Sequence, residues 1–542
     1  MKPESDLAVV PVTKKAEVIK RLQELVPPGS PEPHDPEVLT KLRTLTVELI
    51  EAYKAEGQLE DDPFADVRDR TIQLYTSEVS EQLKGKVALV TGGEGCVGSD
   101  LVKKLVELGA KHVISVDNAR CGYPLESKPI GEKKESVTRY AADVRNYDSL
   151  NSIFDAEKPE LVFHLAAQRQ PGLAEKKVRE TISTSLLGTE NIIKLCEKYG
   201  VQQCVFSSTG KASRYFTAEV YAASKKIAEW QFAQAVQQGK VTYSMVRFTH
   251  TLDNSLVSQQ IDEKIKIGPV VNVHAPHRYL TAQNLSEARH LLLNALIFSQ
   301  PDKLKFLTVT NLGWPTETLE MILHKIVQSG KDLPIYFQGL QPGYEEPFFL
   351  GQFDYSNPTD IHLLINSLED PYRTHDSSRD MVITELAPFS TELLDKHVWA
   401  LKTLIADPEL PEAQLKPCLA QAVKEITSSI CAKASPQALL KILKWGINPK
   451  RIKAKEIIVE SHRDILELVV KGLYGRLSQD ALNTSIVTAD EFEELVEILS
   501  TLPGLEKEVA YMRAISRQGT NLAQAQNQGT KDAKENALVG KG

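Results

Sequence analysis

A tyrosine and a lysine four residues apart follow a cluster of hydroxyl side chains in the stretch SSTGKASRYFTAEVYAASKKIAEW, residues 207–230. On a helix, Tyr221 and Lys225 would lie one turn apart on the same face. A phenol has a pKa near 10 and is a poor base at neutral pH, but an adjacent ammonium stabilises its phenolate. Such a pair can take a proton from a bound hydroxyl. Thr209 or Ser208 would hydrogen-bond the reacting oxygen from the end of the preceding strand.

A glycine-rich turn supplies the second chemical signal. VALVTGGEGCVGSD places Gly92, Gly95 and Gly98 three apart, directly after an apolar run and at the start of a helical pattern. Such glycines permit a tight turn, close approach of the backbone to a diphosphate, and close packing of helix on strand. The helix start then offers N–H groups to phosphates. An unliganded strand–helix turn is the alternative, but Asp117 follows about 20 residues later, where a ribose diol would bind.

These features predict a nicotinamide dinucleotide site at the ends of the first strands. Asp117 should repel a 2′-phosphate, which favours NAD, whereas the nearby Arg120 keeps NADP open. Asp143 and Val144 are expected to contact the adenine, and a helix N-cap is an alternative role for Asp143. The predicted cofactor contacts are Gly92, Gly95, Cys96, Val97, Gly98, Asp117, Asn118, Arg120, Asp143, Val144, Leu165, Ala166, Ala167 and Lys225.

The elements that must position these residues begin at Lys86. Apolar runs (KVALVTGG, HVISVDN, ELVFHLAA, QCVFSST, TYSMVRF) alternate with helical patterns. This alternation predicts an α/β fold, a Rossmann-type doubly wound parallel sheet with helices on both faces. The expected domains are an N-terminal helical extension (1–84) that includes one helix over 65–83, a Rossmann domain (85–394) with a smaller substrate-binding part mainly at 248–394, a C-terminal helical domain (395–518) and a disordered tail (519–542).

Composition narrows the range of partners. The 542 residues carry a net charge of -8, which argues against nucleic acid as the main partner. No apolar run reaches the roughly 18 residues that cross a bilayer, and the first residues lack the apolar core of a secretory signal. The six cysteines are sparse and form no CxxC pair. They predict reduced thiols in a cytoplasmic chain without a metal site.

Together these segments resemble the extended short-chain dehydrogenase/reductase family. The glycine triplet, HLAA, LLGTENI, SST and YAASK occur in that family's order and spacing. Further segments, MVRFTHTL, HRYLTAQNLSEA and GLQPGYEEPFF, are similar to those of polysaccharide-biosynthesis enzymes, the inverting nucleotide-sugar 4,6-dehydratases and epimerases. The resemblance covers about residues 84–349 and neither helical extension. It ranks catalysis by Tyr221 and Lys225 above the alternative of a tyrosine that packs on the sheet.

The resemblance implies an NAD-dependent enzyme that oxidises a hydroxyl of a nucleotide-linked sugar by hydride transfer. It also implies a homo-oligomer, because relatives pair through helices beside the active site. The inverting dehydratases carry an Asp–Lys pair after the Ser-Thr, with the lysine as base and the aspartate as proton donor for loss of water. Here Lys211 is kept and Gly210 replaces the aspartate. The dehydratases also often lack the tyrosine that this chain keeps, so both departures favour epimerisation or oxidoreduction over dehydration.

The substrate side departs from the family as well. His250 stands where an asparagine meets the nucleotide, and Gln341 replaces an arginine that binds the diphosphate. Arg278 is kept and could hold a phosphate, while Gln168 and Arg169 are expected to face the cleft and His164 to be packed. These changes leave two alternatives open: an oxidoreductase that acts on a biosynthetic intermediate without a nucleotide, and a non-catalytic NAD-binding scaffold.

Overall fold

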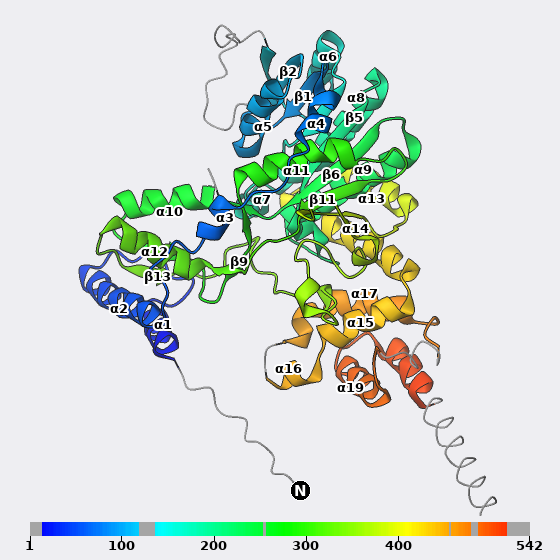
Figure 1. Ribbon diagram of the computed structural model, residues 1–542. Coiled ribbons are helices and arrows are strands. Elements are labelled where there is room, and N and C mark those ends of the chain that lie inside the picture. The colour runs from blue at the N-terminus through cyan, green and yellow to red at the C-terminus, as the bar shows by residue number, and fades with distance from the viewer. Residues whose placement is uncertain (1–12, 119–135, 253–255, 455–456, 479–485, 518–542) are drawn as a thin grey trace, which may run out of the picture.

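The computed structural model describes residues 13–118, 136–252, 256–454, 457–478 and 486–517, and it is built around one nine-stranded sheet (Figure 1). The strand order is β14-β15-β11-β6-β5-β4-β1-β2-β3. Strands β3 to β11 in that order pair in parallel, and β15 and β14 extend the edge antiparallel. The strands are β1 (Val87–Thr91), β2 (His112–Asp117), β3 (Val137–Ala141), β4 (Leu161–His164), β5 (Gln203–Thr209), β6 (Thr242–Phe248), β11 (Lys305–Val309), β14 (Thr374–His375) and β15 (Met381–Glu385).

Helices cover both faces of this sheet, which confirms the predicted Rossmann-type α/β class. One apolar core joins the sheet to α6, α8 and α9, and a second joins the opposite face to α4, α5 and α11. The strands are apolar along their length because both faces are buried. The covering helices are α4 (Thr76–Leu83), α5 (Cys96–Glu107), α6 (Tyr147–Glu157), α8 (Val178–Tyr199), α9 (Val220–Gln238) and α11 (Leu285–Phe298).

The strand order reverses at β1, which lies between β2 and β4. In such sheets a crevice opens outside the carboxyl ends of the strands at the point of reversal. The residues that end β1, β2 and β5 are Thr91, Asp117 and Thr209. The topology therefore gathers the glycine turn and the serine–threonine cluster at one edge of the sheet.

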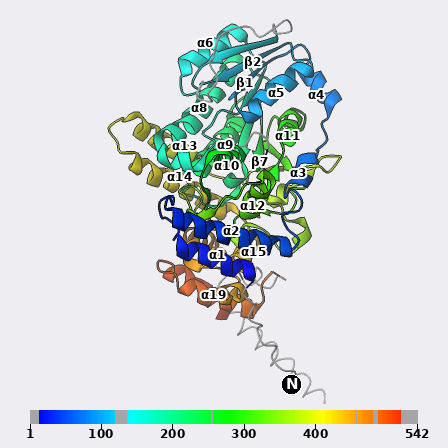
Figure 2. The same ribbon diagram turned by 90° about the vertical axis from the view of Figure 1, so that its left-hand side faces the viewer.

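A smaller part of the chain lies below this edge of the sheet (Figure 1). It consists of short strand pairs and two helices. The N-terminal helices α1 and α2 share its apolar core and lie against it in both views (Figure 2). The Tyr53 hydroxyl of α2 donates to Glu317 at 2.6 Å, which ties the two together. The elements are α1 (Lys14–Leu25), α2 (Pro36–Ala55), α10 (Leu256–Ile267), α12 (Thr318–Ser329) and the pairs β7 (His250–Thr251) with β10 (Ala282–Gln283), β9 (Tyr279–Leu280) with β12 (Thr316–Glu317), and β8 (Val271–Val273) with β13 (Ile335–Phe337).

The prediction of one helix over residues 65–83 is wrong. The structure has two helices there, α3 (Ala65–Asp69) and α4, with an extended stretch between them. In that stretch, Gln73 N–H donates to Asp380 and Tyr75 N–H donates to Asn294, at 2.7 and 3.2 Å. Long-range partners therefore replace the local hydrogen bonds that helix periodicity alone would favour.

Among the described residues, the C-terminal helices share an apolar core with the sheet domain and do not form a separate core of their own. One apolar core contains residues of α8 and α9, among them Trp230, together with residues of the C-terminal helices. Thr427 also donates to the carbonyl of Tyr215 at 2.8 Å, and Lys416 pairs with Glu175 at 2.6 Å. These helices are α13 (Thr391–Ala406), α14 (Glu412–Lys433), α15 (Pro436–Gly446), α16 (Pro449–Lys453), α17 (Arg463–Leu473) and α19 (Ala489–Ser500).

In the described part of the chain, every helix is either too short or too polar to pass through a membrane.

Candidate active site

A single cavity of about 2020 Å³ follows the carboxyl ends of the strands and continues into the smaller part of the chain. It brings together every predicted site residue that the structure describes; Arg120 lies outside the described residues. The predicted residues that line it are Gly92, Gly95, Cys96, Val97, Gly98, Asp117, Asn118, Asp143, Val144, Leu165, Ala166, Ala167, Gln168, Arg169, Ser208, Thr209, Lys211, Tyr221, Lys225, His250, Arg278 and Gln341.

The glycine turn fits a diphosphate. Gly92 has φ +70, and a Cβ there would lie 2.9 Å from the amide nitrogen of Ala166. A Cβ on Gly98 would lie 2.1 Å from the carbonyl oxygen of Gly92, so only glycine lets α5 start this close to β1. No side chain caps α5 at its N-cap, Gly95. Gly95 and the first residues of α5 line the cavity, so the helix start lies where a phosphate could bind.

Acidic side chains mark the second strand end. Asp117 is 7% exposed, and its carboxylate accepts the Glu94 N–H at 3.3 Å. Glu94 in turn accepts from Ser115 at 2.5 Å and from Arg139 at 3.0 Å. Asp117 lines the cavity, and Glu94, paired with Arg139, lies behind it among the described residues.

The alternative role of Asp143 as a helix cap is wrong. The Asn146 side chain caps α6 by accepting the N–H of Ser149 at 3.0 Å. Asp143 instead accepts the N–H of Arg145 at 2.9 Å and pairs with its guanidinium. The carboxylate therefore stabilises the loop after β3, on the wall of the cavity.

Tyr221 and Lys225 stand in the first turns of α9 and line the cavity with Thr209, which ends β5. Burial raises the pKa of the Tyr221 phenol, and a hydrogen bond with Thr209 partly offsets that rise. The Lys225 ammonium donates to the carbonyl of Ser207 at 2.7 Å and lies 4.5 Å from the centre of the Phe206 ring. Burial lowers the pKa of Lys225 to about 7. The site thus holds a phenol, a hydroxyl and a lysine that titrates near neutrality.

The side chains of Ser208 and His164 are buried and interact with other side chains inside the protein. The Ser208 hydroxyl donates to Glu229 at 2.5 Å, so Thr209 and not Ser208 is the hydroxyl beside Tyr221. His164 is 1% exposed and its Nδ1 lies 2.7 Å from the Thr91 hydroxyl, which matches its expected packed role. Burial lowers its pKa to about 3, so the ring is neutral at physiological pH.

Leu364 fills the space beside Gly210. A Cβ added at Gly210 would lie 2.2 Å from Leu364 Cδ2, and the φ angle of Gly210 is not positive. The obstacle to a larger residue is therefore steric and not conformational. At the position where the resembled dehydratases carry their acid, a carboxylate would fit only if Leu364 moved, and this apolar side chain occupies the space beside the glycine.

We expect Gly210→Asp to destabilise the protein by about 1–3 kcal/mol, because the added side chain overpacks against Leu364. Leu364→Ala alone should cost about 2–5 kcal/mol by leaving a cavity. In the double variant the two costs should sum to less than their separate values, since each change relieves the other. Urea denaturation of the four proteins measures this coupling; strictly additive costs would contradict the proposed contact.

Lys211 is held by the protein on the cavity wall. Its ammonium donates to Glu219 at 2.6 Å and to the carbonyl of Gly343 at 2.8 Å. Glu219 is 4% exposed and also pairs with Arg214 at 3.1 Å. Burial lowers the pKa of Lys211, and Glu219 opposes that effect. Two of its three N–H groups therefore donate to groups of the protein, which fixes the position of the ammonium on the cavity wall.

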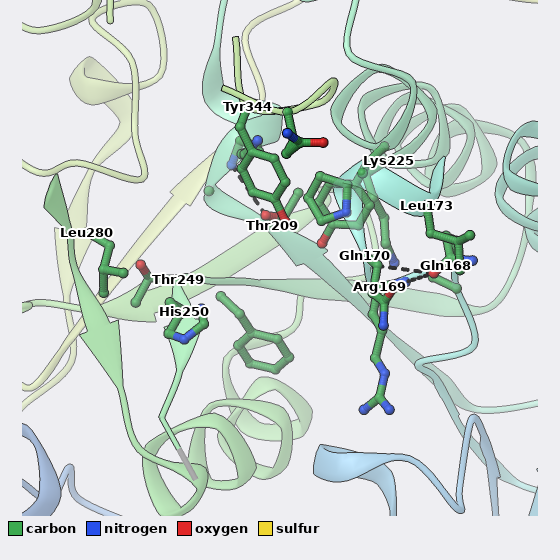
Figure 3. A pocket seen from close by; sticks show the side chains of 18 of the residues that line it. Gln168, Arg169, Gln170, Leu173, Thr209, Lys225, Thr249, His250, Leu280 and Tyr344 are labelled. Atoms are coloured by element: carbon green, nitrogen blue, oxygen red, sulfur yellow. Dashed lines mark hydrogen bonds between the residues drawn. The ribbon is translucent and has the colours of Figure 1, made fainter. Parts of the chain in front are cut away.

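Gln168 and Arg169 lie on one side of the cavity and His250 on another (Figure 3), and Arg278 and Gln341 also line it. The Gln168 side chain accepts the backbone N–H groups of Arg169 and Gln170 at 3.0 and 3.1 Å, so it shapes its own loop. Burial lowers the pKa of His250, which keeps the ring neutral. The guanidinium of Arg278 has no ion-pair partner among the described residues and lines the cavity. Arg278 is therefore a cation that is available to an anionic ligand.

Two features of the site were not found from the sequence. Tyr344, which follows Gln341 by three residues, lines the cavity and contacts Lys211 through its ring. Ser461, His462 and Asp464 of the C-terminal helical region also line it, although no strand-end signal pointed to them. Tyr344 lies in the segment GLQPGYEEPFF. Its position directly after a glycine was the one sequence feature that could have pointed to it.

Curated relatives match a little over half of this chain. The chain is 28% identical over 315 residues to the probable polysaccharide biosynthesis protein EpsC of Bacillus subtilis (strain 168), covering 55% of this chain and 51% of that protein. It is 26% identical over 350 residues to the capsular polysaccharide biosynthesis protein CapD of Staphylococcus aureus, covering 60% and 56%. The chain thus spans about half the length of these relatives.

Solved structures also align with part of this chain. Pen from Bacillus thuringiensis is 21% identical and aligns with a TM-score of 0.47 over 56% of this chain and 88% of that one. The UDP-glucose 4-epimerase of Thermus thermophilus, solved with NAD, is 21% identical, with a TM-score of 0.40 over 47% and 88%. The profile of the family described as "Polysaccharide biosynthesis protein" matches residues 88–350, the segment that supplies most of the cavity wall. Residues 88–350 of this chain therefore belong to the polysaccharide biosynthesis protein family.

Proposed function

We propose that this protein is an NAD-dependent enzyme that epimerises a nucleotide-linked sugar by transiently oxidising one of its hydroxyls, without loss of water. One observation carries the proposal: Tyr221, Lys225 and Thr209 share the cavity of the glycine turn, while Leu364 fills the place of the elimination acid. Proton transfer to and from a hydroxyl is thus provided for, and proton transfer for elimination is not. The family membership of residues 88–350 supports the substrate class.

The residues divide the work as follows. Tyr221 accepts the proton of the substrate hydroxyl, and the Lys225 ammonium stabilises the phenolate that forms transiently. Thr209 holds the reacting oxygen in line with the phenol. A nicotinamide ring bound in the cavity would supply the hydride acceptor. Tyr221 returns its proton when the carbonyl is reduced on its other face, which inverts the carbon with no net oxidation.

NAD is the proposed cofactor in preference to NADP. Asp117 stands at the end of β2, where the ribose diol of a bound dinucleotide would lie, and Glu94 adds a second carboxylate nearby. A 2′-phosphate there would meet the Asp117 carboxylate, and the guanidinium of Arg139 is already paired with Glu94. Like-charge contacts of this kind disfavour the phosphate.

The substrate diphosphate is proposed to bind near Arg278, the cation that has no ion-pair partner among the described residues. Gln341, on the opposite loop, can offer amide N–H groups but no charge. A homo-oligomer and a cytoplasmic location stay predictions. The buried face of α8 and α9 is covered by α13 and α14, so an oligomer of this chain would use other surfaces.

The test is to incubate the purified protein and NAD with a panel of nucleotide sugars while following cofactor absorbance and product mass. We expect product of unchanged mass with one inverted carbon, because the hydride that leaves is returned. Loss of about 18 mass units would indicate dehydration, and loss of about two would indicate net oxidation. Either result would overturn the proposed epimerisation.

Cofactor binding without turnover across the panel would contradict the proposal in a different way. It would favour an oxidoreductase that acts on another class of intermediate, or a scaffold that binds NAD without catalysis. Calorimetry with NAD and NADP on the same preparation separates these outcomes from a protein that binds no dinucleotide.

A further inference from the structure

We propose that Tyr344 is a sugar-recognition residue whose hydroxyl hydrogen-bonds a hydroxyl of the hexose beside the reacting carbon. The proposal rests on the proposed function, since it names the part of the substrate that this wall of the cavity contacts. Tyr344 lines the cavity together with Thr209, Lys211 and Tyr221. Figure 3 shows its ring reaching into the pocket towards Thr209.

The ring is fixed from two sides. Lys211 Nζ lies 5.0 Å from the ring centre, and the ring of His274 meets it edge to face with centroids 5.2 Å apart. The backbone before it is fixed as well, because the Gly343 carbonyl accepts from Lys211 at 2.8 Å and Gly343 has φ +86. A Cβ on Gly343 would lie 2.8 Å from the backbone of Pro171, so the loop sits close against α7 (Pro171–Lys176).

The hydroxyl, in contrast, is left for a ligand. In the part of the chain that the structure describes, no side chain or backbone group hydrogen-bonds the Tyr344 oxygen. The side chain is partly exposed on the cavity wall, so its hydroxyl is accessible to a ligand. Burial raises the pKa of Tyr344, so its phenol stays protonated and able to donate at neutral pH.

The chemistry of the surroundings favours a sugar hydroxyl over a phosphate. The Lys211 charge is already paired with Glu219, whose carboxylate also acts on the Tyr344 phenol, so the local field is not cationic. An anion would meet an acidic neighbour there. A neutral hydroxyl can both donate to and accept from a phenol, and a phenol fixed by its neighbours loses little conformational entropy on binding.

The experiment compares UDP-glucose with UDP by calorimetry on the full-length protein in the presence of NAD. We expect Tyr344→Phe to weaken UDP-glucose about 5- to 10-fold, the effect of one lost hydrogen bond, and to change UDP affinity less than twofold. Tyr372→Phe is the matched control, since this tyrosine is 41% exposed and does not line the cavity. It should change neither affinity.

The outcomes separate the inference from the function beneath it. Equal losses for UDP and UDP-glucose in Tyr344→Phe would show that the hydroxyl supports the nucleotide or the fold, and unchanged UDP-glucose affinity would show that it contacts no sugar hydroxyl. Either result overturns the role of Tyr344 while the proposed function stands. A wild-type protein that binds NAD but no nucleotide sugar of the panel, UDP-glucose included, would overturn both.

Discussion

Tyr221→Phe should abolish reduction of the bound cofactor by a nucleotide sugar while leaving NAD affinity within about threefold of the wild type. The substitution removes one oxygen from a phenol that lines the cavity and hydrogen-bonds with Thr209. A positioned acid–base group contributes about 10²- to 10⁴-fold to a rate, so a loss in that range is expected. Single-turnover absorbance of the reduced nicotinamide measures the rate, and calorimetry measures NAD affinity.

The comparison protein for this prediction is again Tyr372→Phe, which makes the same chemical change outside the cavity. It should reduce cofactor at the wild-type rate. Undiminished reduction in Tyr221→Phe would remove this phenol from the mechanism. A loss of NAD affinity larger than tenfold would show instead that the tyrosine supports the cofactor site.

Glu229→Ala should destabilise the protein by about 3–5 kcal/mol, the cost of leaving a buried charge without its partner. Arg247 is fully buried and is held by Glu229 at 2.8 Å and by Glu369 at 2.7 Å. Removing Glu229 takes away one carboxylate of this network and the acceptor of the Ser208 hydroxyl. The midpoint of urea denaturation, converted with the measured slope, gives the change in unfolding free energy.

Asp155→Ala serves as the control for this measurement. Asp155 pairs with Lys158 on the surface, where both side chains are more than 60% exposed. Such pairs contribute less than about 1 kcal/mol, so the control should stay close to the wild type. Similar losses in the two variants would show that the buried network adds no more than a surface pair.

The parallel sheet and the crevice could be predicted because both follow from local patterns. Apolar runs between helical segments indicate a sheet covered on both faces, and a glycine turn after the first strand indicates where the chain reverses direction. The residues at strand ends, such as Asp117 and Thr209, then gather in one place by topology. Periodicity was less informative between Arg70 and Tyr75, where long-range hydrogen bonds override a helical pattern.

The distal wall of the site could not be predicted, because it depends on contacts across long stretches of chain. Leu364 reaches Gly210 from more than 150 residues away, and sequence spacing does not reveal which side chain fills a gap left by a glycine. Lys211 pairs with Glu219. It also contacts the ring of Tyr344 and the carbonyl of Gly343, which lie on a distant loop. The sequence indicated which residues carry chemistry, whereas the fold decides which of them are already engaged.

The packing of α14 on α9 also means that α9 stays uncovered during translation until α14 has been synthesised. Thr427 and Tyr215 are 212 residues apart in the chain, yet they share a buried hydrogen bond beneath the helix that carries Tyr221. At the usual pace of about 5–20 residues per second, a ribosome would need roughly 10–40 s to deliver the second partner. During that interval the nascent polypeptide exposes the apolar face of α9 to the cell, so chaperone occupancy should be highest in this window of translation.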